Sequence, residues 1–170
     1  MSNDVAGTGV RPEHRPGELV YLFDLVAHLE HPRLDLGDGP LGRRFFDRVS
    51  TGSFEGSRLR GEVLSGSADP LLRRADGVAV INARAVLRTD DGALILMTYD
   101  GRVVIPPDVA PLIGDRERWH DVDPSRYFIR TAPLFETGAD RYRWLNSVVA
   151  VGYGYLAEDG GIGYRVFQVL

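Results

Sequence analysis

The sequence contains no cysteine, and this absence excludes two kinds of site. Without thiols, the 170-residue chain can form neither a disulfide framework nor a thiolate metal site. It also lacks any apolar run near the roughly 20 residues that span a bilayer. The polar residues 1–17 show no apolar segment of a secretory signal. We therefore expect a cytoplasmic protein with no membrane partner.

An excess of positive charge is missing too. The net charge is −4 and the pI is near 5.5, whereas nucleic-acid binding needs a basic surface, so we expect no nucleic-acid partner. The sequence has no Walker loop, no Rossmann glycine pattern and no G-x-S-x-G nucleophile elbow. Gly152 and Gly154 lie in a strand-like segment, where glycine indicates a bulge or close packing. We expect no cofactor.

A histidine-based metal site is not expected either. His28 and His31 are three residues apart, with Asp24 and Asp35 nearby. That spacing fits neither a metallopeptidase helix nor a strand, where ligands on one face are two residues apart.

The length and the hydrophobic fraction of 44% are ordinary for one globular domain. No repeat or linker divides the chain. We predict a flexible amino-terminal tail over residues 1–17 and a single domain over residues 18–170.

Short apolar segments separated by glycine-marked turns predict a β meander. Residues 78–89 are the clearest strand, because apolar and polar side chains alternate along them. Asp90, Asp91 and Gly92 then predict a tight hairpin, and Asp100 with Gly101 predicts a second one. Further strands are predicted over residues 19–29 (ambiguous with a helix), 45–50, 58–64, 93–99, 103–105, 125–133, 144–156 and 162–170, with one or two helical turns over 107–113.

About eight such strands usually close into a barrel, because closure removes exposed edges. We therefore predict an all-β fold, an antiparallel up-and-down β-barrel with about eight strands and one short helix. A barrel of that size is wide enough for side chains or one small ligand.

Several short stretches also occur in a characteristic order. They are residues 52–56 (GSFEG), 59–64 (LRGEVL), 66–69 (GSAD), 76–78 (DGV), 83–84 (AR), 87–95 (LRTDDGALI), 130–133 (RTAP), 135–138 (FETG) and 142–146 (YRWLN). Together they resemble the bacterial family catalogued as domain of unknown function 3237, over about residues 18–170. The resemblance implies a small barrel similar in build to allene oxide cyclases and lipocalin-like proteins. It implies no particular chemistry.

Charged residues within predicted strands are the candidates for catalysis. A charge that points into a barrel needs a partner or a ligand, because burying it alone is costly. The candidate catalytic residues are Asp69, Arg84, Arg130 and Glu136. Arginine suits a developing oxyanion, and a buried carboxylate, whose pKa rises, suits proton transfer. Alternatively, Asp69 with Arg84 and Glu136 with Arg130 form structural ion pairs.

Aromatic and amide side chains are the candidates for binding a substrate. They are Tyr21, Tyr99, Tyr142, Trp144 and Asn146, of which the last three share one face of a predicted strand. Tyr99 is also a candidate acid or base, and Trp144 alternatively belongs to an ordinary aromatic core.

Two functions follow from these candidates. The first is a cofactor-independent acid/base enzyme, an isomerase, cyclase or lyase, acting on an apolar or aromatic metabolite. The second is a non-catalytic binding or carrier barrel for a small hydrophobic ligand. The expected partner is a small molecule, and a homodimer is the commonest assembly for such a domain.

Overall fold

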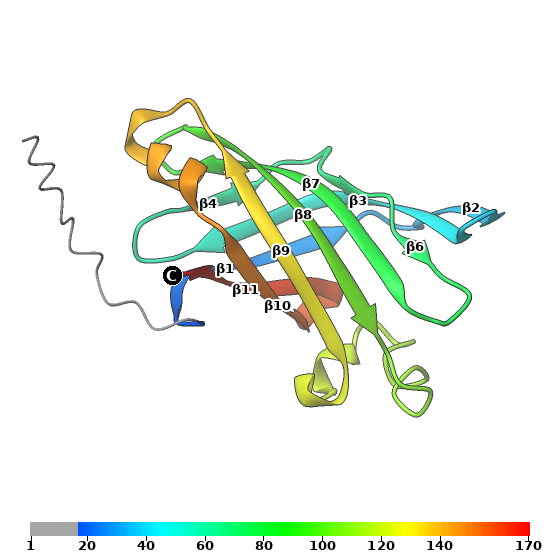
Figure 1. Cartoon of the computed structure of the whole chain (residues 1–170). Helices are drawn as coiled ribbons and strands as arrows, with labels where there is room; N and C mark the ends of the chain where they lie inside the picture. The colour runs from blue at the N-terminus through cyan, green and yellow to red at the C-terminus, as the bar shows by residue number, and fades with distance from the viewer. Residues whose placement is uncertain (1–16) are drawn as a thin grey trace, which may run out of the picture.

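Antiparallel strands surround a single apolar core (Figure 1). The computed structural model describes residues 17–170, so the predicted tail over residues 1–17 lies outside the described part except for Gly17. The strands are β1 (Leu19–Leu29), β2 (Leu34–Gly39), β3 (Gly42–Glu55), β4 (Arg60–Val63), β5 (Ala68–Asp69), β6 (Leu72–Arg73), β7 (Ala79–Thr89), β8 (Leu94–Val104), β9 (Phe128–Glu136), β10 (Ala150–Leu156) and β11 (Gly161–Val169). Four short 3₁₀ helices accompany them, η1 (Trp119–Asp121), η2 (Pro124–Arg126), η3 (Asp140–Ser147) and η4 (Glu158–Gly160).

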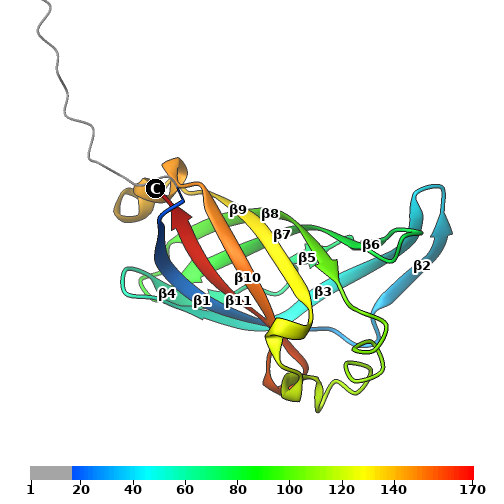
Figure 2. The same ribbon diagram turned by 60° about the horizontal axis from the view of Figure 1, so that its bottom comes forward.

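The strands close into a ring with eight positions. The sheet runs in the order β1-β11-β10-β9-β8-β7-β4-β3, and β1 pairs with β3 to close it. The short strands β4, β5 and β6 share the one position between β3 and β7. The eight-stranded barrel is therefore confirmed. Strand β2 pairs only with the first part of β3 and projects from one end of the barrel (Figure 2).

No helix in residues 17–170 is long and apolar enough to cross a membrane.

Strand β7 has the predicted alternation, and the hairpin at residues 90–92 joins it to β8. The ambiguous segment 19–29 is strand β1. The second hairpin, predicted at Asp100 and Gly101, is wrong because β8 continues through both residues to Val104. Gly101 instead faces the interior, where a side chain would collide with the carbonyl oxygen of Arg130 and with Thr131. A close approach between strands, rather than a turn, requires this glycine.

The predicted strand over residues 144–156 is wrong in its first half, because η3 ends at Ser147 and β10 begins only at Ala150. The Asn146 side chain explains the interruption. Its oxygen accepts from the backbone N–H of Thr137 at 2.9 Å, and its amide donates to the Thr137 carbonyl at 2.9 Å. The expected helical turns over 107–113 are hydrogen-bonded turns without a regular helix. Strands β2, β5 and β6 have no counterpart among the predicted strands.

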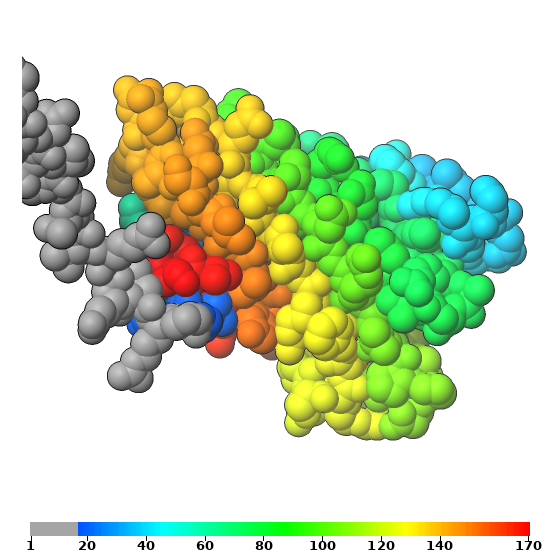
Figure 3. All heavy atoms as spheres, in the orientation of Figure 1, coloured from blue at the N-terminus to red at the C-terminus, as the bar shows by residue number. Residues whose placement is uncertain are grey.

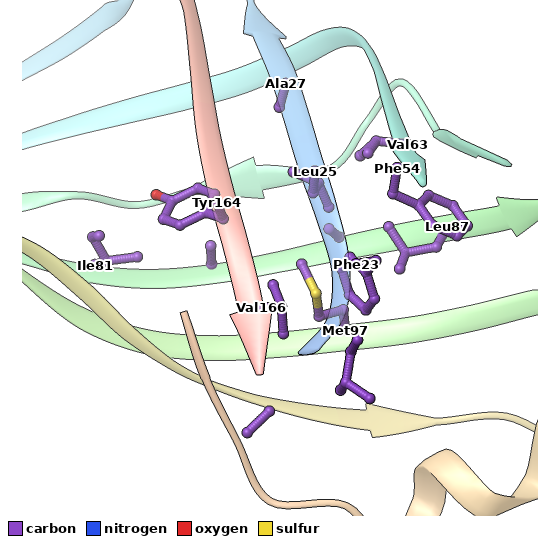
Figure 4. Packing of buried hydrophobic residues seen from close by; sticks show 14 of the residues in the cluster. Phe23, Leu25, Ala27, Phe54, Val63, Ile81, Leu87, Met97, Tyr164 and Val166 are labelled. Atoms are coloured by element: carbon purple, nitrogen blue, oxygen red, sulfur yellow. The ribbon is translucent and has the colours of Figure 1, made fainter. Parts of the chain in front are cut away.

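One end of the barrel is filled with apolar side chains. The Phe23 ring lies edge-on to Phe54 at 5.8 Å and to Phe135 at 5.9 Å between ring centres. Figure 4 shows Phe23 and Phe54 beside Leu87, with Tyr164 lying toward the other end of the core. Because the packing is dense near Phe23, polar groups can lie inside the barrel only toward the other end.

Glycine in β10 makes room for neighbouring side chains, as the close-packing interpretation predicted. A methyl group added at Gly154 would overlap the Ile129 side chain and lie 3.1 Å from the Tyr164 ring.

We therefore expect Gly154→Ala to lower the free energy of unfolding by about 1–3 kcal/mol through overpacking. Urea denaturation measures this change. Gly138→Ala is the matched control, because an added methyl group there meets nothing within 4 Å. Equal stability of the two variants would show that β10 can shift outward at no cost.

Candidate functional site

Polar side chains gather in and around the end of the barrel from which β2 projects. We call this group the polar cluster. Figures 2 and 3 show the β2 hairpin and the segment 105–127 projecting beyond the strands. The cluster consists of Asp47, Asp69, Tyr99 and Tyr164 from the barrel wall and of His31, Arg33 and Arg116 from the segments that follow β1 and β8.

Two carboxylates face each other across β3 and β5, where Asp47 pairs directly with Asp69. Side chains alternate along a strand, and Phe45 and Val49, on the same face as Asp47, belong to the buried core. Asp47 itself is only 7% exposed. Like charges directly opposite each other are destabilising, so this pair needs compensation.

The guanidinium of Arg33 compensates Asp47. Its Nε donates to Oδ1 at 2.9 Å and its Nη2 to Oδ2, which forms a bidentate fork. The guanidinium carbon also lies 4.1 Å from the centre of the Phe45 ring. Both oxygens of Asp47 are thus engaged by one cation. Asp69 forms no such ion pair with a cation in residues 17–170.

Asp69 is the carboxylate with unusual proton affinity. Its pKa is raised to about 6, mainly by burial and also by the charge of Asp47. The backbone N–H of Asn82 opposes this rise by donating to Oδ1 at 2.9 Å, and the charges of Arg33 and Arg44 also oppose it. The other oxygen, Oδ2, has no hydrogen-bond partner within residues 17–170. A carboxylate with one fixed and one available oxygen is suited to proton transfer.

Two phenols accompany this carboxylate. The rings of Tyr99 and Tyr164 meet edge-on at 5.6 Å between centres, and burial raises the pKa of both hydroxyls, so both are neutral donors near pH 7. Neither hydroxyl bonds to another described residue. Every fully enclosed side-chain nitrogen or oxygen in the described part of the chain has a partner. Both hydroxyls therefore border space that a solvent-sized group can reach.

The structure brings two predicted residues together, Asp69 and Tyr99, since the charge of Asp69 contributes to the raised pKa of Tyr99. Arg84 does not join them. It lies between the buried Ala83 and Ala85, so strand alternation turns it outward, where it donates to the side-chain oxygen of Asn82 at 2.9 Å. The alternative Asp69–Arg84 ion pair does not form either.

The other charged candidates also lie outside. Arg130 projects from the outer face of β9 with its guanidinium carbon 4.3 Å from the centre of the Tyr153 ring. Glu136 is exposed at the end of β9 and forms no ion pair with Arg130. Tyr21 is 40% exposed, and its hydroxyl donates to the Glu55 carbonyl at 3.2 Å.

The three remaining candidates belong to η3, near the apolar end of the barrel. The hydroxyl of Tyr142 donates to Asp91 at 3.0 Å, and Trp144 lies under the guanidinium of Arg58, 3.5 Å from the ring centre. Asn146 bonds to the backbone of Thr137. All three have structural contacts and do not touch the polar cluster.

Two surface hollows lie away from the cluster. One, of about 290 Å³, is lined by residues that include Leu96, Leu134, Glu136 and Asn146. Its only carboxylate, Glu136, is exposed and lacks a cation. The other, of about 300 Å³, lies beside Arg58 and is mostly polar. The carboxylates that line them, Glu136 and Asp90, are both exposed.

No group of three or more His, Asp or Glu side chains that could hold a metal ion occurs in residues 17–170. Of the carboxylates near His28 and His31, Asp24 binds Arg165 at 3.0 Å and Asp35 binds Arg43 at 2.6 Å. Both are therefore engaged by arginine.

Sequence reasoning missed Asp47, Tyr164, Arg33 and Arg116. A signal existed for the first, because Asp47 lies two residues from both Phe45 and Val49 in the predicted strand 45–50 and so shares their apolar, inward face. Tyr164 likewise lies in the predicted strand 162–170. The two arginines lie in segments without periodicity, so no pattern could have placed them.

Comparisons with known proteins agree with the barrel fold. The profile of the family described as "Protein of unknown function (DUF3237)" matches residues 17–169. A UPF0311 protein from Clostridium acetobutylicum is 32% identical over 130 residues, which cover 76% of this chain and 80% of the relative. A crystal structure of a β-barrel-like protein from Acinetobacter baumannii matches with a TM-score of 0.77 and 30% identity, covering 94% of this chain and 100% of the other. An enzyme from Penicillium herquei has the same fold, with a TM-score of 0.66, 23% identity and coverage of 95% and 99%.

Proposed function

This chain belongs to the DUF3237 family of proteins of unknown function, and from that premise we propose an activity based on the site. We propose that the protein is a cofactor-independent acid/base enzyme, an isomerase, cyclase or lyase, acting on an apolar or aromatic metabolite. One observation carries the proposal. Asp69, whose pKa is raised to about 6, lies at the polar end of a barrel with an apolar core, beside two phenols with available hydroxyls.

In this proposal Asp69 is the general base. Its Oδ2 removes a proton from a substrate carbon, and the electron pair of that C–H bond moves onto a conjugated carbonyl oxygen. The hydroxyl of Tyr99 or Tyr164 donates a hydrogen bond to the resulting enolate oxygen. Protonated Asp69 then returns the proton to another atom, or the enolate expels a leaving group. No redox step or co-reactant is needed.

The environments of the two facing carboxylates support different roles. Asp47 is held by the Arg33 fork, which occupies both of its oxygens. Asp69 has no such cation, and its pKa is raised to about 6. Paired carboxylates whose environments push their proton affinities apart are a recurring arrangement in acid/base enzymes. The enzyme from Penicillium herquei adds only that this fold accommodates catalysis.

Deuterium incorporation tests the proposal even though the substrate is unidentified. A metabolite extract from the organism that carries this chain is incubated in D₂O with the wild-type protein or with Asp69→Asn. Mass spectrometry then follows carbon-bound deuterium and the appearance of new products. Proton transfer at carbon should label or convert at least one metabolite with the wild type, and Asp69→Asn should abolish this change.

A different result would favour the carrier function. In that case native mass spectrometry would detect the same small molecule bound to wild type and Asp69→Asn, and neither protein would change the labelling of the extract. Label incorporated equally by both proteins would remove Asp69 from the mechanism.

A further inference from the structure

We propose that the substrate carries an ionised carboxylate and that Arg116 binds this group at the polar end of the barrel. The inference rests on the proposed function of the same site and adds the substrate class and the residue that recognises it. The carboxylate would be held beside the cluster, and the apolar part of the substrate would extend toward Tyr99 and Tyr164.

Arg116 is a half-buried cation that has no anionic partner among the residues that the structure describes. None of the ion pairs in residues 17–170 includes it. Of its five N–H donors, one is directed at a protein acceptor, where Nη1 lies 3.0 Å from Nδ1 of His31. Burial lowers the pKa of Arg116, which reflects incomplete compensation of its charge. A partly desolvated guanidinium with free donors is a receptor for a carboxylate.

The carboxylate of Asp47 is near Arg116 but does not neutralise it. Its charge raises the pKa of Arg116, whereas the charge of Arg33 lowers it. Both oxygens of Asp47 are already occupied by the Arg33 fork. Around Asp47 two arginines therefore share one carboxylate, and because the Arg33 fork occupies it, Arg116 has no direct ion pair in residues 17–170.

The position of Arg116 is fixed before any ligand arrives. Its guanidinium carbon lies 4.6 Å from the centre of the Trp119 ring, and the indole N–H of Trp119 donates to the buried carbonyl of Ala157 at 2.8 Å. The contact with Nδ1 of His31 requires the neutral form of that ring, and both burial and Arg116 lower the pKa of His31. Neutral His31 then carries its proton on Nε2, a second donor beside the cation. Such preorganisation lowers the entropic cost of binding.

Arg116 and the proposed base, Asp69, lie at the same end of the barrel. Asp47 interacts electrostatically with Arg116 and, across β3 and β5, with Asp69. A carboxylate bound at Arg116 therefore lies at the same end of the barrel as the reacting carbon, which would be presented to Asp69. An acid with an apolar or aromatic body satisfies both requirements.

Matched acids and amides test this inference. Benzoate, phenylacetate and 1-naphthoate are titrated by ligand-observed NMR at pH 7 against the full-length protein, each beside its neutral primary amide. The variants are Arg116→Gln, Arg116→Lys and, as a matched control, Arg58→Gln. Arg58 also lies over an indole ring, at 3.5 Å from its centre, but on the surface near η3.

We expect saturable binding of at least one acid, with the corresponding amide at least tenfold weaker. Arg116→Gln should weaken that acid at least tenfold, Arg116→Lys should weaken it less, and Arg58→Gln should bind as the wild type does. Thermal denaturation confirms that each variant is folded, and Arg116→Lys keeps the test valid if the glutamine variant does not fold.

Three results would overturn the anion site. They are equal binding of acids and amides, unchanged affinity in both Arg116 variants, and no saturable binding by any acid. The experiment separates this inference from the proposed function. Labelling in D₂O without selective acid binding would remove the anion site and leave the acid/base function. Selective acid binding with no labelling would leave an anion-binding barrel without catalysis.

Discussion

Asp69→Asn is expected to reduce turnover by about 10²- to 10⁴-fold, the usual contribution of a positioned general base, and at the same time to make the protein more stable near neutral pH. The amide keeps the size of the side chain, and its oxygen can still accept from the backbone N–H of Asn82. It cannot remove a proton from carbon. Loss of activity with a gain in stability distinguishes a functional carboxylate from a structural one.

The gain in stability follows from the raised pKa. The folded protein holds the proton of Asp69 up to a pKa of about 6, whereas the unfolded chain releases it near the ordinary value of 3.8. Between these values the wild-type protein loses stability as pH rises, and above about 6 the loss is complete. A difference of about two pKa units corresponds to a cost on the order of 3 kcal/mol. The asparagine variant avoids this cost, so its advantage should be full at pH 8 and vanish near pH 4.

Urea denaturation at several pH values measures the stability difference between Asp69→Asn and the wild type. The pH dependence of labelling in D₂O measures the effect on turnover. The wild-type rate should rise as Asp69 ionises, with a midpoint near its pKa of about 6. Glu136→Gln is the matched control, because this exposed carboxylate should affect neither stability nor rate. Lower stability of Asp69→Asn at pH 8 would show that the carboxylate is structurally required, which would contradict the assignment.

The sequence predicted the barrel but only part of the site, and strand periodicity explains both results. Alternation along residues 78–89 correctly separated an inner apolar face from an outer charged face. The same alternation places Arg84 outside, between two inward alanines, so the proposed catalytic role for it conflicted with the pattern that defined its strand. A mid-strand arginine is a site candidate only if its own face is apolar.

The rest of the cluster depends on contacts between distant segments. Asp69 is a candidate from the sequence, but its raised pKa depends in part on Asp47, which only the pairing of β3 with β5 brings opposite it. Arg33 and Arg116 lie in irregular segments after β1 and β8, and the closed ring brings both to Asp47. Tyr142, Trp144 and Asn146 were misplaced because the side chain of Asn146, by bonding to the Thr137 backbone, replaces the expected strand with η3. Such side-chain competition with a strand has no periodic signal.

The electrostatic coupling of the two carboxylates leads to a second prediction with a large effect. Arg33→Gln removes the cation that engages both oxygens of Asp47 and leaves that carboxylate unpaired opposite Asp69. Breaking a buried pair in this way costs about 3–5 kcal/mol, and because the Arg33 side chain is 36% exposed we expect about 1–3 kcal/mol. The charge of Arg33 also lowers the pKa of Asp69. Its removal should therefore raise that pKa and move the midpoint of the rate profile to higher pH.

Asp47→Asn should shift the pKa of Asp69 in the opposite direction to Arg33→Gln. The charge of Asp47 raises the pKa of Asp69, so the neutral amide should lower it and move the midpoint of the rate profile to lower pH. Carboxyl-carbon NMR of Asp69 gives the pKa directly in both variants, and urea denaturation gives their stabilities. A structural ion pair that merely ties β3 to the segment after β1 would change stability in both variants and leave the Asp69 titration where it was. Opposite shifts would instead show that Arg33 and Asp47 together set the proton affinity of Asp69.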